Sequence, residues 1–266
     1  MLGYNYLGKL GQLGNQMFQY AALRGIAANK GYEFCIPNHD EMVVDVLGNR
    51  LRIEVDKPFE LKGCEFRDTV GDQYVQEPGF AFCQELYDHC PDDVSLVGYF
   101  QSEKYFNNVA DEIREDFTFK DEILEPCKEM ISNVNAPIAL HIRRGDFLKN
   151  SGNHHNLDID YYRRALGKFR GHRNVAIFSD DPQWCKEQEL FSDDRFLIAT
   201  GNGSYVDLCL MSLCSDFIIA NSTYSWWAAW LANKGRVIAP TRWFGPNNQH
   251  LDTKDLYPEH WEIING

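Results

Sequence analysis

The sequence predicts an α/β protein with two lobes, each built around a parallel sheet. Its 266 residues exceed the roughly 150 that one domain usually holds, so two modest lobes with a cleft between them are expected. From residue 137 onward, short apolar runs of strand length alternate with helical segments, and such runs are typical of strands covered on both faces. We expect the first lobe over residues 1–120 and the second over residues 121–266.

The first lobe is expected to begin with a strand, a tight glycine loop and a helix. The helix has Phe18, Ala22 and Ile26 on one side, which indicates a buried face. Residues 37–79 show no clear period, and we leave them unassigned. The predicted elements are strands over Tyr4–Leu10, Tyr32–Ile36 and Ser95–Phe100, the loop Gly11–Gly14 and the helix Asn15–Asn29.

The second lobe has the more regular pattern, and a polar helix over Asp121–Asn133 is placed to link the lobes. Double-sided apolar runs separated by helices predict a parallel sheet. The predicted strands are Pro137–Ile142, Val175–Phe178, Phe196–Ala199, Phe217–Ala220 and Arg236–Ala239. The predicted helices between them are Asp160–Phe169, Gln183–Glu189, Tyr205–Cys214 and Thr223–Asn233.

The charge of the chain excludes two classes of partner. A formal net charge of −13 argues against binding to nucleic acid or to anionic membranes, because both need basic surfaces. An anionic ligand would need a local basic pocket. The sequence has no apolar run of about 18 residues, and its start has no basic segment followed by an apolar one. We therefore expect no integral membrane segment and a cytoplasmic protein.

Neither the cysteines nor the histidines form a pattern typical of a metal site. The 8 cysteines are scattered without a Cys-x-x-Cys pair, so we expect free or buried thiols. His154 and His155 are adjacent and His141 is separate, and adjacent histidines seldom point at one ion; we expect the pair on a loop surface. The sequence therefore predicts no metal ligands.

Polar residues cluster where the predicted strands of the second lobe end. In an open parallel sheet, ligands bind beyond the carboxyl ends of the strands, where loops and helix N-termini meet. Three polar blocks occupy such positions: His141-Ile142-Arg143-Arg144-Gly145-Asp146, Ser179-Asp180-Asp181 and Asn221-Ser222-Thr223-Tyr224-Ser225.

The arginine pair is the most specific feature of these blocks. The guanidinium groups of Arg143 and Arg144 suit a diphosphate, because they match phosphate oxygens in a bidentate way and stay charged. The alternative is a structural pairing of one arginine with Asp146 or with a helix C-terminus. The position of the pair at a strand end favours the ligand.

The other blocks each have a functional and a structural interpretation. Asn221–Ser225 opens a helix, where free N–H groups attract an anion, but it is also an ordinary N-cap. Ser179–Asp181 suits a nucleobase or ribose, or less well a metal, but it is also a turn before Pro182. Gly11–Gln16 is a glycine loop that lets backbone approach a ligand, and alone it is a plain turn. Three tryptophans on the helix after Ser225 are expected in the core: Trp226, Trp227 and Trp230.

Taken together, four ordered blocks resemble those of family 11 glycosyltransferases, the α-1,2-fucosyltransferases of bacterial type. They span residues 11 to 227, and four blocks in order are far more specific than one. The blocks are Gly11-Gln12-Leu13-Gly14-Asn15-Gln16-Met17-Phe18-Gln19-Tyr20-Ala21, His141-Ile142-Arg143-Arg144-Gly145-Asp146, Phe178-Ser179-Asp180-Asp181 and Asn221-Ser222-Thr223-Tyr224-Ser225-Trp226-Trp227.

The resemblance implies a GT-B-like fold of two Rossmann-type lobes, with an acceptor-side first lobe and a second lobe that binds GDP-fucose. It implies transfer of L-fucose, with inversion, to the 2-hydroxyl of a terminal galactose in a glycan, without a metal or other cofactor. It also allows a location at the membrane where glycans are assembled. The region between the glycine loop and residue 95 offers no motif to align, so the choice of acceptor glycan is not implied.

The resemblance also implies roles for single residues. Arg143 or Arg144 would bind the β-phosphate, and Asn15 would lie near the transferred sugar. The diphosphate would contact Ser222, Thr223 and Ser225, and guanosine would contact His141 and Asp180. The neighbouring Gln16, Ser179 and Asn221 are counted as substrate-binding with them.

Asp146 is the first candidate for the base that accepts the proton of the acceptor hydroxyl. The adjacent arginines would make its carboxylate a poor proton acceptor, so a role in orienting Arg143 is the alternative. Three other functions remain open: another sugar-nucleotide transferase, a non-catalytic module that binds nucleotides or glycans, and a phosphate-handling enzyme. The last is disfavoured because the sequence has no Gly-x-x-x-x-Gly-Lys-Ser/Thr loop.

Overall fold

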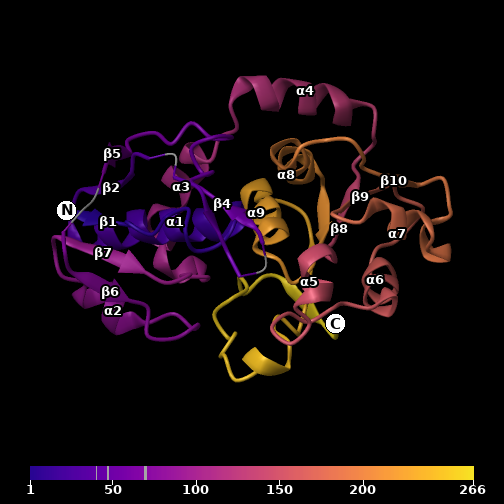
Figure 1. Ribbon diagram of the computed structural model, residues 1–266. Coiled ribbons are helices and arrows are strands. Elements are labelled where there is room, and N and C mark those ends of the chain that lie inside the picture. The colour runs from indigo at the N-terminus through magenta and orange to yellow at the C-terminus, as the bar shows by residue number, and fades with distance from the viewer. Residues whose placement is uncertain (40, 47, 69–70) are drawn as a thin grey trace. The chain divides into compact units, whose positions relative to one another are not determined.

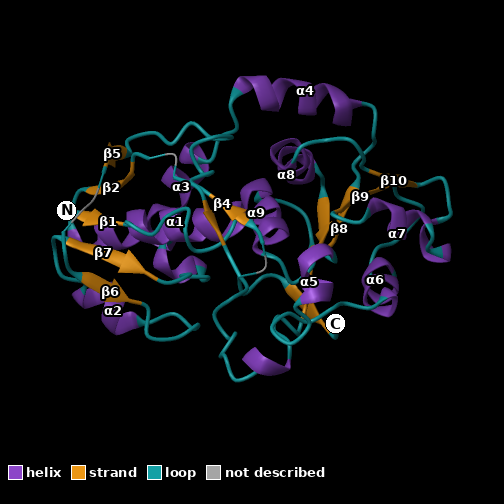
Figure 2. Ribbon diagram, in the orientation of Figure 1, coloured by secondary structure: helices purple, strands orange, loops and turns teal. Residues whose placement is uncertain are grey.

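The computed structural model describes residues 1–39, 41–46, 48–68 and 71–266. The chain divides into two compact units, Met1–Lys120 with Leu251–Pro258, and Asp121–His250 with Glu259–Gly266. Each unit has a parallel sheet with helices, which confirms the predicted α/β class (Figures 1 and 2). Leu251–Pro258 lie in the first unit, so the expectation of an unbroken second lobe over 121–266 is wrong in that segment.

The first unit contains a five-stranded sheet in the order β5-β2-β1-β7-β6, in which all paired strands are parallel. These strands are β1 (Leu2–Gly3), β2 (Phe34–Pro37), β5 (Glu65–Arg67), β6 (Tyr74–Gln76) and β7 (Val94–Val97), and β3 (Val43–Val44) pairs antiparallel with β4 (Arg50–Leu51). The helices are α1 (Leu13–Lys30), α2 (Gln84–His89), α3 (Ala110–Asp116) and the short 3-10 helices η1 (Glu103–Tyr105) and η2 (Asn107–Val109). The predicted first helix is confirmed as α1, with Phe18, Ala22 and Ile26 buried.

The predicted strand over Tyr4–Leu10 is wrong. Only Leu2–Gly3 form a strand, and the following residues make consecutive turns, with Leu7 N donating to Tyr4 O at 2.9 Å. Gly8, at φ +81°, adopts a backbone conformation that suits a glycine turn and not a strand. The predicted strand Ser95–Phe100 likewise ends early, at Val97, because Phe100 has a φ of +53°.

The second unit contains a six-stranded parallel sheet in the order β10-β9-β8-β11-β12-β13. Counted along the chain, this is the order 3-2-1-4-5-6 of dinucleotide-binding Rossmann folds. The strands are β8 (Ile138–Ile142), β9 (Val175–Ser179), β10 (Phe196–Ile198), β11 (Asp216–Ile218), β12 (Val237–Pro240) and β13 (Glu262–Ile264). The helices are α4 (Asp121–Ser132), α5 (Gly145–Lys149), α6 (Ile159–Leu166), α7 (Pro182–Lys186), α8 (Ser204–Leu213), α9 (Thr223–Ala232) and the 3-10 helices η3 (Glu189–Phe191) and η4 (Pro246–Asn248).

The core of the second unit confirms the role predicted for the tryptophans. Trp226, Trp227 and Trp230 of α9 are all buried, and the rings of Trp226 and Trp227 meet edge to face with centroids 5.0 Å apart. The strands below them are apolar on both faces, as in β8, whose five residues are all buried. All eight cysteines are free thiols, six of them buried.

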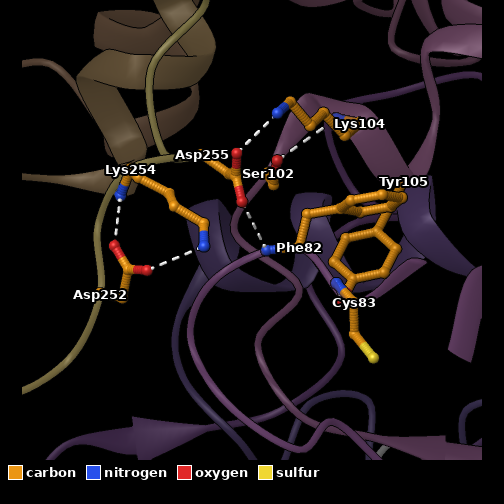
Figure 3. Close-up of polar contacts among 8 residues, drawn as sticks. All are labelled: Phe82, Cys83, Ser102, Lys104, Tyr105, Asp252, Lys254 and Asp255. Carbon is orange, nitrogen blue, oxygen red and sulfur yellow. Dashed lines mark hydrogen bonds and ion pairs between the residues drawn. The ribbon is translucent and has the colours of Figure 1, made fainter. Parts of the chain in front are cut away.

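In the segment Leu251–Pro258, the carboxylate of Asp255 binds two residues of the first unit (Figure 3). Asp255 Oδ1 lies 2.6 Å from Lys104 Nζ, and Asp255 Oδ2 accepts the backbone N–H of Phe82 at 3.2 Å. The chain then enters β13 at the edge of the second unit's sheet. Among the described helices, none is long and apolar enough to cross a bilayer.

Candidate functional site at the switch point of the second sheet

The strand order places the candidate site between β8 and β11. From β8 the chain proceeds outward through β9 and β10, and it then returns to add β11 on the other side of β8. At such a switch point the loops that follow the two central strands diverge and leave a crevice at their carboxyl ends. Arg143 and Arg144 follow β8, and Asn221 and Ser222 lie between β11 and α9. The first and third polar blocks therefore leave adjacent strands at the same edge.

Arg143 lies between two carboxylates. Its Nη2 is 2.7 Å from Asp146 Oδ1 and its Nη1 is 3.0 Å from Asp180 Oδ2. The guanidinium carbon also lies 5.4 Å from the centre of the Phe147 ring. The structural pairing of an arginine with Asp146, the alternative in the sequence, is thus present, and Arg143 is clamped by its neighbours.

Asp180 completes this clamp because a glycine lets it approach. Its Oδ1 accepts the backbone N–H of Arg144 at 2.9 Å while its Oδ2 faces Arg143. A Cβ atom at Gly145 would lie 2.5 Å from Asp180 Oδ2, far inside van der Waals contact. The glycine of the Arg-Arg-Gly-Asp block is therefore required by the packing of Asp180. A glycine directly after the arginine pair was the signal in the sequence for this contact.

Arg144 is held differently and keeps more of its donors. Its Nε lies 3.0 Å from Asp181 Oδ2, and its guanidinium carbon lies 4.1 Å from the centre of the Trp184 ring. Stacking on an aromatic face fixes the plane of the guanidinium group. Since the ion pair uses Nε, the two terminal nitrogens of Arg144 remain to bind oxygens of a ligand. Trp184 is not among the residues predicted from sequence. Its position three residues after Asp181 was the sequence feature that could have indicated it.

The charge of this cluster corrects one expectation. Three carboxylates, those of Asp146, Asp180 and Asp181, face the two guanidinium groups, so these five side chains together carry no net positive charge. Attraction for an anion must come from directed N–H donors and from the helix N-terminus.

The second block forms the turn and helix start that its sequence allowed. Asp181 is the N-cap of α7, where its carboxylate accepts the backbone N–H of Trp184, and Pro182 is the first helical residue. This bond and the ion pair with Arg144 lower the pKa of Asp181. Ser179 Oγ accepts the N–H of Asp181 at 3.0 Å. In the described part of the chain, the side chains that converge as a metal would require are His172, Asp193 and Asp194, outside this block.

His141 and Ser225 lie beneath the site and join its two sides. His141 Nδ1 is 2.8 Å from Ser225 Oγ, and the two side chains are 4% and 0% exposed. Burial, helped by the nearby Arg143 charge, lowers the pKa of His141 to about 3, so the imidazole is neutral. Their predicted contacts with a substrate stay predictions. The two side chains connect β8 to α9.

The N-terminus of α9 is open to a ligand. Ser222 is the N-cap and Thr223 the first helical residue, and the described structure shows no side-chain cap bond from Ser222. The first backbone N–H groups of this ten-residue helix, which lack intrahelical partners, are therefore placed to bind an anion. Asn221 is buried, and its amide donates to the backbone oxygens of His155 at 2.8 Å and Trp243 at 2.9 Å, so it holds two loops together.

The remaining predicted residues lie apart from the arginine cluster in sequence and role. In the first unit, Asn15 is partly exposed at the start of α1. Gln16 is fully buried, and its amide binds backbone groups of Gly11, Arg52 and Glu54, which gives it a structural role. His154, expected on a loop surface, is half-buried and stacks on Phe147 with ring centroids 4.1 Å apart.

Comparison with known structures relates the fold to two fucosyltransferases. POFUT1 in complex with GDP-fucose aligns with a TM-score of 0.53 at 14% identity, over 88% of this chain and 94% of that one. The NodZ α-1,6-fucosyltransferase soaked with GDP-fucose aligns with a TM-score of 0.54 at 13% identity, over 90% of this chain and 94% of that one. The fold is therefore GT-B-like, as predicted.

Sequence comparison gives the family. The α-1,2-colitosyltransferase of Escherichia coli is 31% identical over 96% of both chains, and the O-antigen biosynthesis glycosyltransferase WbnK of the same species is 29% identical over 93% of this chain and 97% of its own. The bovine galactoside α-(1,2)-fucosyltransferase 1 is 26% identical over 96% of this chain and 74% of its own. The model of glycosyl transferase family 11 matches residues 4–265, and the chain belongs to that family.

Proposed function

We propose that this glycosyltransferase moves L-fucose from GDP-fucose to the 2-hydroxyl of a terminal galactose in a glycan, with inversion. The supporting observation is that the Arg144 guanidinium and the open N-terminus of α9 follow adjacent strands at the switch point of the second sheet. Two sets of fixed donors at one sheet edge suit the two phosphates of a sugar nucleotide.

The proposed chemistry depends on the charge that the leaving diphosphate gains. As the bond to the anomeric carbon breaks, the sugar becomes oxocarbenium-like and negative charge grows on the β-phosphate. Donors that are already oriented bind this charge more strongly in the transition state than in the ground state, which lowers the barrier. Arg144 is the proposed β-phosphate ligand, because its terminal nitrogens are left open by the ion pair through Nε.

Arg143 and Asp146 receive supporting roles in this proposal. Asp146 is paired with Arg143 at 2.7 Å, so its carboxylate is engaged by the guanidinium group. Asp146 therefore orients Arg143, and Asp180 holds the same guanidinium group from the other side. An Asp146→Asn variant that folds is expected to keep most of its activity. A loss of activity of at least ~10²-fold would instead show that Asp146 is the general base.

Linkage analysis of the product tests the reaction. The purified chain is incubated with GDP-fucose and lactose, and fucose is expected on the 2-hydroxyl of galactose. Parallel reactions use nucleotide-activated colitose, GDP-mannose and UDP-galactose. The colitose donor is included because one relative is named a colitosyltransferase. Transfer from another donor only, or GDP binding without turnover on any acceptor, would reject fucosyl transfer as the function.

Arginine substitutions test the proposed site. Arg144→Ala is expected to lower kcat by at least ~10²-fold, the usual scale for removing one stabiliser of transition-state charge. Arg143→Ala should also lower kcat, through loss of the clamp that orders the site. Arg195→Ala is the matched control. Arg195 also stacks on an aromatic ring, that of Phe196, but it directly precedes β10 and is not part of the arginine cluster. Near-normal turnover in both Arg143 and Arg144 variants would refute the site.

The proposal uses no metal, because Arg144 and the α9 donors bind the diphosphate. Activity is therefore expected to survive treatment with EDTA and dialysis into metal-free buffer. A loss of activity that added Mg²⁺ or Mn²⁺ restores would show that a divalent ion takes part in binding the donor.

A further inference from the structure

The chain of the first unit bends at Gly98, and the segment Gly98–Gln101, named here the turn, lies against the glycine loop that precedes α1. The turn, Gly98–Gln101, follows β7, and β7 pairs with β1, from which the chain enters the glycine loop. None of these residues belongs to the arginine cluster of the second unit. The turn is strained, because Phe100 is a buried non-glycine residue with a φ of +53°. Strained backbone of this kind persists only where its surroundings hold it.

The carboxylate of Glu77 binds the backbone of the turn. Its Oε2 accepts the backbone N–H groups of Tyr99 at 2.8 Å and Phe100 at 2.9 Å. Burial raises the pKa of Glu77 to about 7, although these two hydrogen bonds favour the carboxylate and oppose that shift. A Cβ atom at Gly98 would lie 2.5 Å from Glu77 Cβ, so the carboxylate can support the turn only with glycine at that position.

Gln19 and Tyr4 fasten the turn to the glycine loop. The amide nitrogen of Gln19, which is fully buried in α1, donates to Leu10 O at 2.9 Å and to Gly98 O at 3.1 Å. The backbone N–H of Gly98 donates to the hydroxyl of Tyr4 at 2.9 Å. The turn and the loop therefore form one connected unit.

The last residue of the turn reaches Asn15. Gln101 is 7% exposed, and its Nε2 donates to Asn15 Oδ1 at 3.0 Å. On the other side, Gly11 leaves room for the Asn15 amide, since a Cβ atom there would lie 2.2 Å from Asn15 Nδ2. Because Asn15 Oδ1 accepts from Gln101, the side-chain NH₂ of Asn15 is left to donate to a ligand.

We propose that Gln101, supported by Glu77 through the Gly98–Gln101 turn, is a positioning residue that orients the Asn15 amide as a hydrogen-bond donor for a sugar substrate. The role near the sugar rests on the function proposed above. The orientation of Asn15 by Gln101 rests on contacts within the first unit and is separate from the identity of the donor.

A double-mutant cycle tests whether Gln101 acts through Asn15. The variants are Asn15→Ala, Gln101→Leu and the double variant, with kcat and KM measured for transfer from GDP-fucose to lactose. Gln101→Leu is expected to lower kcat by about tenfold, the effect of a misplaced contact group. The double variant should be no slower than Asn15→Ala, because a residue that acts through Asn15 has no effect once Asn15 is gone. Gln76→Leu on the exposed edge of β6 is the control and should match the native kcat.

Two outcomes of the cycle overturn the proposal. Effects that multiply in the double variant would show that Gln101 acts independently of Asn15, and a native kcat in either single variant would show that the contact has no role in turnover. A general loss of folding would lower kcat in all three variants. Its effects would multiply in the double variant, so it would not be mistaken for action through Asn15.

Hydrogen–deuterium exchange provides a readout that needs no substrate. In Gln101→Leu and in Glu77→Gln, the peptide covering residues 8–16 should exchange faster than in the native protein and in Gln76→Leu. Unchanged exchange in both variants overturns the proposal. If the native chain transfers no fucose, the exchange result still decides whether the turn holds Asn15, so failure of the two proposals can be told apart.

Discussion

Gly145 illustrates how one residue without a side chain determines the geometry of charged neighbours. In Gly145→Ala the new Cβ would overlap Asp180 Oδ2, so Asp180 must withdraw from Arg143. We expect kcat to fall by at least ~10-fold, because groups that bind charge in the transition state are sensitive to small displacements. The control is Gly203→Ala, where nothing lies within 4 Å of the added Cβ. Equal kcat values in the two variants would contradict the steric account of Asp180.

His141 gives a prediction about pH at the same scale. Its pKa falls from 6.5 when unfolded to about 3 when folded, so the unfolded chain binds the extra proton first. This contribution to stability is complete above pH 6.5 and is lost progressively as the pH falls toward 3. Between pH 7.5 and pH 5 the loss is on the order of 2 kcal/mol. Urea unfolding of the native chain and His141→Asn at both pH values measures it, and the variant should lose less stability on acidification.

At the scale of single elements, α9 has two roles that a substitution can separate. Ser222→Asp adds a carboxylate at an N-cap that lacks a side-chain bond in the described structure, and this should stabilise the helix by about 1 kcal/mol. The same negative charge would compete with a phosphate, so GDP affinity should fall by at least ~10-fold. Calorimetry of unfolding and of GDP binding measures both. Gly203→Asp is the control, because the N-cap of α8 also lacks a side-chain bond. It should stabilise α8 by a similar amount and leave the affinity for GDP unchanged.

Element length explains how much of the fold could be predicted. Strands β8 to β12 and helices α6 to α9 were predictable to within a few residues, because each is a continuous apolar or amphipathic run, as in β8 and α9. The short elements α5 and β13 were not predicted. In residues 37–79 the strands have two or three residues each, which is too short for any periodicity. Tyr4 and Leu7 are both buried although they belong to consecutive turns, so apolar residues there resembled a strand.

The same limit applies to the site. Arginines after a strand and a polar helix start could be located from sequence, because they follow from the sheet's topology. The partners of the two arginines could not be predicted from sequence. Asp180 contacts Arg143 and Trp184 contacts Arg144 only because β8 and β9 are adjacent in the sheet. Burial of His141, Ser225 and Gln16 likewise depends on tertiary packing, and sequence blocks alone do not separate supporting residues from ligands.

At the scale of the whole molecule, each unit is built from two separate segments of the chain. Leu251–Pro258 return to the first unit before β13 completes the sheet of the second, so neither unit is a single continuous stretch. Asp255 is the main polar anchor of the returning segment, with one oxygen on Lys104 and the other on the backbone of Phe82 (Figure 3). Its side chain is only 9% exposed, and its bond to Phe82 is partly buried, whereas the ion pair with Lys104 is exposed to water.

Asp255→Ala should therefore release the segment while leaving β13 paired. The backbone N–H of Phe82 loses its acceptor and Lys104 loses its counter-ion, so we expect stability to fall by about 1–3 kcal/mol and hydrogen exchange to rise over residues 251–258. Lys104→Met is the matched control: it removes the half-exposed partner but keeps the bond to Phe82, and should cost less than about 1 kcal/mol. If the two variants exchange equally fast in this segment, the buried bond to Phe82 is not what holds it. If exchange also rises over 262–264, the segment and β13 unfold together, and the return of the chain to the first unit helps to hold the edge of the second sheet.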